Sequence, residues 1–440
     1  MTAQRLPKGG HIDRTCPLTF HWDGTSMSGY AGDTLASALM ANGEQILGRS
    51  FKYHRPRGIM SAGVEESGAL VTVGQGAKQD ANVRATTQPL YEGLIARGQN
   101  AWPSVRLDFG AINNLFGRFF AAGFYYKTFM GLPPFEWGRG TGMWMRYEKI
   151  IRKAAGMGTA SREPDPDRYE HAHGYCDLLV VGSGPAGRAA AHCAAKAGCD
   201  VILVEQDAVF GGDTLSQPDN TSVLHEELSA LRACGVRLMT STTAFGLYDN
   251  GVAGLLERVT DHLTDPPSWL PRQRFWTVRA RATVIAAGAL ERHIAFGDND
   301  RPGVMTVNAG RTYLNRFAIQ AGEKIVIATN NDSAYTTASD LAGSGASVTM
   351  LDSRREIPSS LRSQCDTAGI VITPDAAPMK ALGGKAVSGL TTAIRQGNSW
   401  REEENIDCDL VLVSGGWSPV VNLLSHRGVK PVWHPELACF

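Results

Sequence analysis

Short runs of consecutive apolar residues, separated by polar or glycine-rich turns, recur through the second half of the chain. Such runs are typical of strands that a parallel sheet buries on both faces. Two intervals between them carry helical patterns, at 188–196 and at 334–342. The order strand, helix, strand predicts an α/β fold of doubly wound units. The expected strands are 176–181, 200–204, 236–240, 275–287, 324–328, 347–351 and 408–414.

The first 90 residues show a different pattern, in which short strands surround one helix. Predicted strands at 18–22 and 27–30 are joined by an Asp-Gly turn, and a helix capped by Asp33 or Thr34 runs to residue 41. A further strand is expected at 69–73. Two strands, a helix and another strand in this length predict a ferredoxin-like β-grasp domain.

The β-grasp fold often carries a [2Fe–2S] cluster held by four cysteine thiolates. No cysteine occurs between Cys16 and Cys176, and the loop at 59–67 that would hold the ligands has none. We therefore expect the β-grasp fold without its cluster.

Residues 91–172 form a segment dense in aromatic side chains, with polar residues from 161 onward. Aromatic residues are enriched at protein interfaces, so we interpret this segment as a connector and interface region. The predicted organisation is thus a β-grasp domain at 1–90, the connector at 91–172, and a two-dinucleotide-type domain at 173–440.

Charge and cysteine content limit the function. Lysine plus arginine number 43, as do aspartate plus glutamate, so the net charge of zero gives no support for binding nucleic acid or a membrane surface. A basic loop with aromatic residues at 48–58 is better interpreted as partner-facing or paired with acids. The eight cysteines are scattered without a C-x-x-C pair, which indicates a reducing, cytoplasmic location and no metal site.

Membrane insertion is not expected from the sequence. The residues before position 11 lack the apolar core of a secretory signal. The most apolar longer stretch, 109–130, is interrupted by Arg118 and Lys127.

The strongest motif is the glycine triplet Gly182, Gly184 and Gly187, which lies between a predicted strand and the helix at 188–196. In this pattern the first glycine allows a tight turn, the second lets the backbone approach a pyrophosphate, and the third lets the helix pack on the strand. Glu205 follows the next strand, where a carboxylate can bind ribose hydroxyls. The motif predicts a dinucleotide site for FAD or NAD rather than NADP.

Small residues at the ends of later segments are candidates to approach the same dinucleotide. Gly212 follows Phe210 and Gly211, and Gly288 ends the strand that begins at 275. The pair Gly415 and Gly416 ends the last predicted strand and is a second candidate to close over the first site.

A second strand–helix–strand unit, at about 303–405, has a different turn. Residues 329–333 read Thr-Asn-Asn-Asp-Ser and contain no glycine. Asn and Asp tolerate left-handed backbone geometry, but their side chains crowd a pyrophosphate. We interpret this unit as a Rossmann unit that has lost dinucleotide binding.

The architecture resembles that of glutathione-reductase-like flavoproteins with two dinucleotide domains. The disulfide-reducing members carry a C-x₄-C pair just after the ribose acid, and residues 209–216 have no cysteine. Disulfide reduction of that kind is therefore excluded.

A more specific resemblance, to the α subunits of heterotetrameric sarcosine oxidases, runs from about residue 16 to the C-terminus. It rests on strings outside the dinucleotide motifs, at 29–39, 48–58, 82–87, 122–130 and 301–305. The family's α subunit is about twice this length, so the chain looks truncated, and its folate-binding half is absent.

That resemblance implies a reaction carried mostly by other parts of a complex. In the family, FAD on the β subunit oxidises sarcosine, FMN at the α/β interface passes electrons to oxygen, and the one-carbon unit goes to tetrahydrofolate in the C-terminal half of α. The partners would be β, γ and δ subunits. NAD, which is not turned over, would occupy this chain, and we expect no catalytic residue here. The implied NAD contacts are Gly182, Gly184, Ala186, Gly187, Glu205, Gln206 and Gly212, and Ala244 and the Gly415–Gly416 turn would close over the NAD.

Three other functions stay open from the sequence. The chain could be a self-contained FAD/NAD oxidoreductase, although such an enzyme needs two working dinucleotide turns and the turn at 329–333 has no glycine. The chain could be the α subunit of a related FAD-dependent amine, opine or hydroxyproline dehydrogenase, although those relatives usually keep the cluster cysteines. It could also be a non-catalytic scaffold subunit with an empty glycine site.

Overall fold

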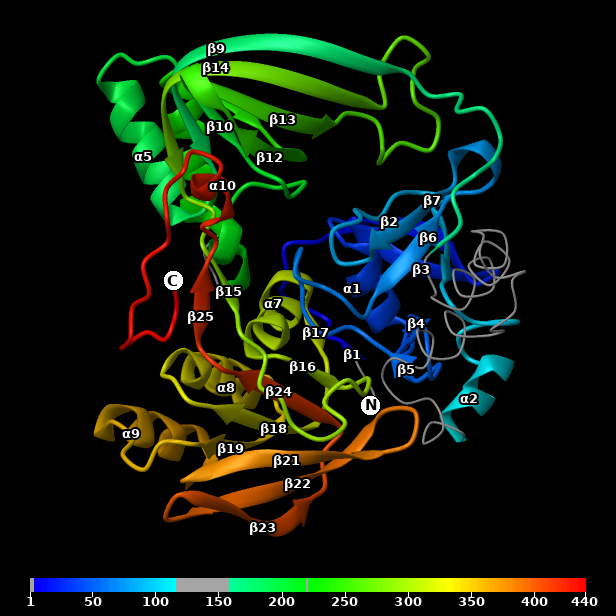
Figure 1. The fold of residues 1–440 in the computed structure, drawn as a ribbon, viewed down its shortest axis with the longest axis vertical. Coiled ribbons are helices and arrows are strands. Elements are labelled where there is room, and N and C mark those ends of the chain that lie inside the picture. The colour runs from blue at the N-terminus through cyan, green and yellow to red at the C-terminus, as the bar shows by residue number, and fades with distance from the viewer. Residues whose placement is uncertain (1–3, 116–157, 219–220) are drawn as a thin grey trace, which may run out of the picture.

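The structure is a computed structural model that describes residues 4–115, 158–218 and 221–440 (Figure 1). The predicted architecture, a β-grasp domain followed by a two-dinucleotide-type α/β fold, is confirmed. In Figure 1 the β-grasp domain lies beside both α/β units, which are stacked one above the other. Most of the aromatic connector, including the string at 122–130, lies outside the described residues.

The β-grasp domain is built on a five-stranded sheet of order β3-β2-β8-β6-β7. Asp23 and Gly24 adopt positive φ in the predicted turn between β2 and β3. Thr34 caps α1 through a capping box with Ser37, which explains why the helix begins there. The element bounds are β2 Asp13–Trp22, β3 Thr25–Ala31, α1 Leu35–Ala41, β4 Gly48–Arg49, β5 Pro56–Arg57, β6 Leu70–Val73, β7 Asp80–Arg84 and β8 Ile95–Gly98.

The first α/β unit has a six-stranded sheet of order β11-β10-β9-β14-β13-β12. Leu179 and Val181 of the central strand β9 join one hydrophobic cluster, and Val180 between them joins the cluster on the opposite face. Burial on both faces explains the uninterrupted apolar run. The bounds are β9 Tyr169–Val181, α5 Pro185–Lys196, β10 Val201–Val204, α6 Thr221–Ala233, β11 Arg237–Met239, β12 Thr242–Leu247, β13 Val252–Arg258 and β14 Gln273–Ile285.

The second α/β unit has a five-stranded sheet, β16-β24-β18-β19-β20, in which every pairing is parallel. An antiparallel sheet of β21, β22 and β23 borders it (Figure 1). The bounds are β16 Val304–Thr306, α7 Val307–Phe317, β18 Lys324–Thr329, α8 Ser333–Gly343, β19 Ser347–Asp352, α9 Ser359–Ala368, β20 Val371–Pro374, β21 Ala376–Gly383, β22 Val387–Gln396, β23 Ser399–Ile406 and β24 Leu410–Ser414.

The chain passes between the two α/β units twice, through β15 (Ala289–Glu291) and β25 (Trp417–Pro419), which pair antiparallel. Glu291, the last residue of β15, accepts a hydrogen bond of 2.7 Å from the backbone N–H of Asn308 in the first turn of α7. Burial raises the pKa of Glu291 to about 7. The passage between the units therefore contains a titratable group.

The β-grasp domain packs directly against the second unit. Part of its core and much of the second unit's core belong to one continuous hydrophobic cluster, which includes Leu39, Ile59, Met305 and Tyr313. Arg55 adds ion pairs across the boundary to Asp298 and Asp300, each at 2.7 Å. The basic loop at 48–58 is thus paired with acidic side chains in the structure. This is one of the two arrangements that the sequence predicted.

No helix in the described ranges is long and apolar enough to cross a membrane.

Candidate functional site

The glycine turn joins the end of β9 to the start of α5, as the sequence predicts. Gly182 has a φ of +99°, and a Cβ there would lie 2.4 Å from the carbonyl oxygen of Ala286. A Cβ on Gly187 would lie only 1.9 Å from the carbonyl oxygen of Gly182. Both positions therefore require glycine, because a side chain would collide with backbone.

Gly184 differs from its two neighbours in the motif, because an added Cβ would meet no protein atom within 4 Å. Its backbone faces open space at the N-terminus of α5. As N-cap it supplies no side-chain acceptor to the first turn, and Ala186 in that turn is exposed. Free N–H groups at the start of a 12-residue helix form a ready site for phosphate oxygens.

Glu205 lies at the end of β10 and turns its carboxylate towards the glycine turn. One oxygen, Oε2, accepts hydrogen bonds from the backbone N–H (3.0 Å) and the hydroxyl (2.7 Å) of Ser183. The other, Oε1, accepts one from the N–H of Asp207 at 3.0 Å. A carboxylate offers about four acceptor positions, so these three bonds leave room on Oε1 for a hydroxyl.

Two residues that the sequence reading did not select hold the turn in place. The Ser183 hydroxyl also accepts a hydrogen bond of 2.9 Å from the N–H of Gly211. Arg188 is buried in the first turn of α5 and donates to the carbonyls of Ser183 (2.8 Å) and Gly211 (3.0 Å). Its Nε contacts Glu227 at 2.6 Å. A cation at a helix N-terminus is unfavourable because it opposes the helix dipole. An arginine in the first turn of a predicted helix was therefore the signal in the sequence that Arg188 has a specific role.

The structure places Gly212 directly against the turn. A Cβ on this residue would lie 2.9 Å from the Cα of Gly184, so the 211–212 segment and the glycine turn are in contact. Gln206 is exposed beside Glu205. Ala244, a residue of β12, packs against the hydrophobic core of the first unit. The first residue of β12, Thr242, donates from its N–H to the carbonyl of Glu205 at 2.8 Å.

The remaining predicted residues, Gly288, Gly415 and Gly416, lie next to the two segments that connect the α/β units, β15 and β25. Gly288 has a φ of +70° and open space at its Cβ position, two residues after the Ala286 that contacts Gly182. Gly415 and Gly416 follow β24 and exchange backbone hydrogen bonds of 2.8 Å with Arg292. The carbonyl of Gly415 also lies 3.5 Å from the side-chain amide of Asn330. This pair therefore borders the turn of the second unit and the passage between the units.

The turn of the second unit, between β18 and α8, is filled by its own side chains. Oδ1 of Asn331 accepts from the backbone N–H (3.2 Å) and the hydroxyl (2.6 Å) of Ser333 at the start of α8. Its Nδ2 donates to the Ser414 hydroxyl at 3.0 Å. A side chain of the protein thus occupies the position at the helix N-terminus that a phosphate oxygen would need.

An acid also ends the second strand of this unit, as Glu205 does in the first. Asp352 is fully buried at the end of β19, accepts from the Tyr335 hydroxyl at 2.7 Å and pairs with Arg354 at 2.8 Å. Arg354 reaches back to Asp332 of the turn at 2.7 Å. Asp352 therefore forms an ion pair within the protein, and its carboxylate is not available to bind a ribose hydroxyl.

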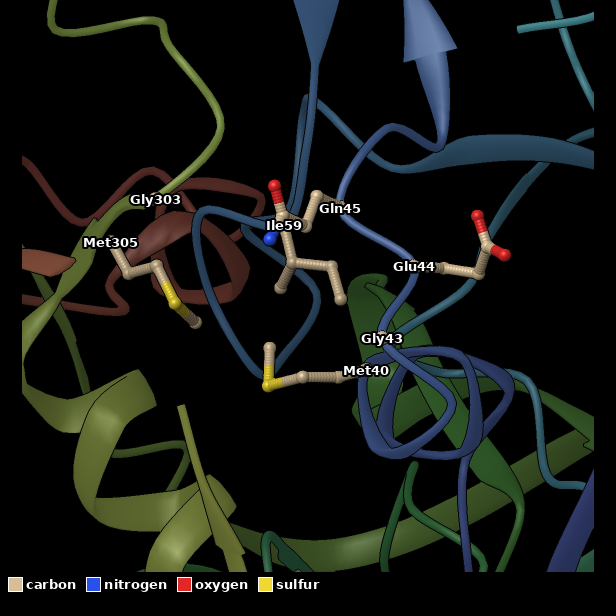
Figure 2. Close-up of a pocket in the computed structure, with 7 residues that line it drawn as sticks. All are labelled: Met40, Gly43, Glu44, Gln45, Ile59, Gly303 and Met305. Carbon is tan, nitrogen blue, oxygen red and sulfur yellow. The ribbon is translucent and has the colours of Figure 1, made fainter. Parts of the chain in front are cut away.

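A pocket between the β-grasp domain and the second unit is shown in Figure 2, where Met40, Ile59 and Met305 converge from different segments. Its volume of about 10 Å³ is room for roughly one water molecule. Within the described ranges no three His, Cys, Asp or Glu side chains gather in a way that could hold a metal ion.

The residues of the first turn fit a dinucleotide. The fit rests on the open side of Gly184, the uncapped helix N-terminus behind it and the acceptor position left on Glu205. In the second turn, Asn331 accepts from the N–H of Ser333 at the start of α8, and Asp352 is paired with Arg354.

Comparison with known proteins agrees with this geometry. Residues 176–434 match the family model described as pyridine nucleotide-disulphide oxidoreductase. The chain belongs to that family. Residues 15–101 match the model of a 2Fe-2S iron-sulfur cluster binding domain. The glycine turn at 182–187 lies near the start of the region that matches this family model.

The predicted resemblance to sarcosine oxidase α subunits is also confirmed. The chain is 45% identical, over its whole length, to 44% of sarcosine oxidase subunit alpha of Rhizobium meliloti. It is 33% identical, over 98% of its length, to 40% of the corresponding subunit of a Corynebacterium species. The chain thus spans less than half the length of these relatives.

Among solved structures, L-proline dehydrogenase of P. horikoshii superposes with a TM-score of 0.59 at 17% identity. The match covers 96% of this chain and 65% of the dehydrogenase chain. At this identity the likeness shows a shared fold. Together the comparisons support an oxidoreductase with a dinucleotide-binding fold.

Proposed function

We propose that this chain is the NAD-holding part of an α subunit in a sarcosine oxidase complex. The observation that carries the proposal is the contrast within the chain: one dinucleotide turn is open and uncapped, and the other is filled by its own side chains. A self-contained enzyme that passes electrons between FAD and NAD would need two open turns.

The residues of the first turn would each hold a defined part of NAD. The N–H groups of Ala186 and Gly187 at the start of α5 would bind the pyrophosphate, which passes over Gly184. Glu205 would accept a hydrogen bond from a ribose hydroxyl, and its charge would repel a 2′-phosphate, which favours NAD over NADP. Gln206, Gly212 and Gly288 would line the approach. Ala244, Gly415 and Gly416 would contribute less directly.

The oxidation itself would take place outside this chain. NAD at this site would be a resident group that is not turned over, and FAD on a β subunit would oxidise sarcosine. FMN would lie at the α/β interface, γ and δ subunits would complete the complex, and tetrahydrofolate would bind a region that the longer relatives have beyond the part matched here. None of the described residues is assigned a role as general acid, general base or nucleophile.

The decisive experiment compares Gly184→Val with the unmodified protein. Because a Cβ added at position 184 would lie in open space, the fold should persist while the valine fills the space that the pyrophosphate needs. The purified protein should release about one NAD per chain on denaturation, and the variant should bind NAD at least roughly 100-fold more weakly by equilibrium dialysis. The matched control is Gly343→Ala, at an equally open glycine in the second unit.

Two outcomes would contradict the proposal. Release of FAD from the purified protein, with NADH oxidation by the isolated chain, would identify a self-contained flavoenzyme. Failure to bind NAD at millimolar concentration would identify a scaffold with an empty glycine site.

A further inference from the structure

The β-grasp domain matches a family that binds an iron–sulfur cluster, but its residues do not fit one. A [2Fe–2S] cluster is held by four thiolates. Residues 15–101 contain one cysteine, Cys16, which is exposed on β2. The loop between β5 and β6, residues 58–69, has no thiol. The domain therefore cannot supply the four thiolates that bind a [2Fe–2S] cluster.

What the loop does contain is a buried carboxylate. Glu66 is 2% exposed, and the loop folds back around its side chain. Oε2 accepts hydrogen bonds from the backbone N–H groups of Met60 and Ser61, both at 2.8 Å. Oε1 accepts from those of Gly68, at 2.5 Å, and Ala69, at 3.1 Å. Four backbone donors from both ends of the loop thus converge on one side chain.

The contacts are those of an anion. The backbone partners are all donors, and the Ser61 hydroxyl adds a fifth at 3.4 Å. Burial raises the pKa of Glu66, and the N–H donors oppose that effect. Two backbone N–H donors on each oxygen match the four acceptor positions of a carboxylate, and a protonated acid would have to turn one oxygen into a donor facing two N–H groups.

We propose that the carboxylate of Glu66 replaces the iron–sulfur cluster as the internal anion around which this loop folds. A cluster bound by thiolates is negatively charged and accepts hydrogen bonds from the surrounding backbone. A single glutamate supplies the same two properties from within the chain. The domain thereby keeps the shape of an electron carrier without its redox centre.

The second part of the proposal concerns what the loop does once it is folded. With their N–H groups directed to Glu66, Met60 and Ser61 point their carbonyls to the second α/β unit. Met60 accepts from the N–H of Thr306 at 2.8 Å, and Ser61 accepts from the hydroxyl of the buried Tyr313 at 3.0 Å. Ile59 packs beside Met305 at the same boundary (Figure 2). Glu66 therefore positions the surface by which the β-grasp domain docks on α7.

The test compares Glu66→Gln with Glu65→Gln, its exposed neighbour, in the full chain. The side-chain amide of glutamine has only one acceptor oxygen, and its NH₂ group would face two backbone N–H donors. Two of the four backbone N–H groups would therefore lose their acceptor. Hydrogen exchange measured by mass spectrometry should become roughly 10- to 100-fold faster at 59–69 in Glu66→Gln. Exchange at 304–313, across the boundary, should also become faster. Glu65→Gln should leave both segments as in the unmodified protein.

Unchanged exchange at 59–69 in Glu66→Gln would overturn the proposal, and a change confined to 59–69 would overturn its docking part. If Glu66→Gln does not fold, the unmodified chain still decides. The amides of Met60, Ser61, Gly68 and Ala69 must be among the slowest in the β-grasp domain, and anaerobic incubation with iron and sulfide must give no cluster absorption. Fast exchange at these amides, or stoichiometric iron uptake, would refute the idea. None of these readouts depends on NAD binding.

Discussion

The two α/β units use the same strand–turn–helix scaffold in opposite ways. In the first, Gly184 leaves the N-terminus of α5 open, and Glu205 keeps an acceptor position next to it. In the second, Asn331 accepts a hydrogen bond from the N–H of Ser333, the first residue of α8, and Asp352 is paired with Arg354. The same scaffold can therefore form around a turn whose hydrogen bonds are made by the chain's own polar groups.

The β-grasp domain repeats the same theme. There the carboxylate of Glu66 meets four N–H groups in the loop where a cluster would otherwise sit. An internal carboxylate thus satisfies buried donors in two separate parts of the molecule, since Glu66 accepts from the N–H groups of its loop and Asp352 accepts from the Tyr335 hydroxyl. The high cost of unpaired buried polar groups favours such contacts.

The largest effect is expected from Gly187→Ala in the first unit. The new Cβ would lie 1.9 Å from the carbonyl oxygen of Gly182, so helix and turn must move apart. We expect a loss of about 4 kcal/mol in the free energy of unfolding and no measurable NAD binding. Urea unfolding and equilibrium dialysis test both. Gly343→Ala, in open space, should change stability by less than about 0.5 kcal/mol. Equal effects of the two changes would remove the contrast between the units.

A smaller, pH-dependent effect is expected at Glu291, between the units. The native pKa of about 7 lies above the ordinary value of 4.5, so the native state holds a proton that the unfolded state has lost between these pH values. The contribution of this group to stability is therefore complete below about pH 4.5 and falls as the pH rises to about 7, by on the order of 3 kcal/mol. Urea unfolding at pH 5 and pH 8 should show a smaller difference for Glu291→Gln than for the unmodified protein. An identical difference would contradict the assignment.

Asp352→Asn should have the next largest effect. It leaves Arg354 without its buried partner, and we expect a loss of about 2 kcal/mol, because the arginine is partly exposed. NAD affinity should not change, since the first unit is untouched. Thermal unfolding and dialysis, run in parallel, check this. Weaker NAD binding would indicate that the second unit takes part in the site.

The smallest effect is expected from Asn331→Gly. The change removes the side-chain acceptor that Asn331 offers to the N–H of Ser333, and replacement by glycine should cost only about 0.3 kcal/mol. It also opens the turn, yet a second NAD should not bind, because Asp352 stays paired with Arg354. A titration that gives two NAD per chain would show that the asparagine alone closes this turn.

Much of the first site could be predicted from the sequence because its chemistry depends on local geometry. Gly182 and Gly187 are constrained by the backbone of the turn itself, and Glu205 comes directly after the strand next to it. The roles of Ser183 and Arg188 could not be predicted, since their partners, Gly211 and Glu227, come from segments 28 and 39 residues away.

By itself the sequence determined the strand–turn–helix order at the start of each α/β unit, the β-grasp domain without cluster thiols, and the difference between a glycine turn and an asparagine turn. These follow from apolar runs, residue counts and backbone preferences, which are local properties. Only the tertiary structure decided what fills the places where ligands are missing. The pairing of Asp352 with Arg354, the four donors on Glu66 and the packing of its loop on α7 all depend on which distant groups burial brings within hydrogen-bonding distance.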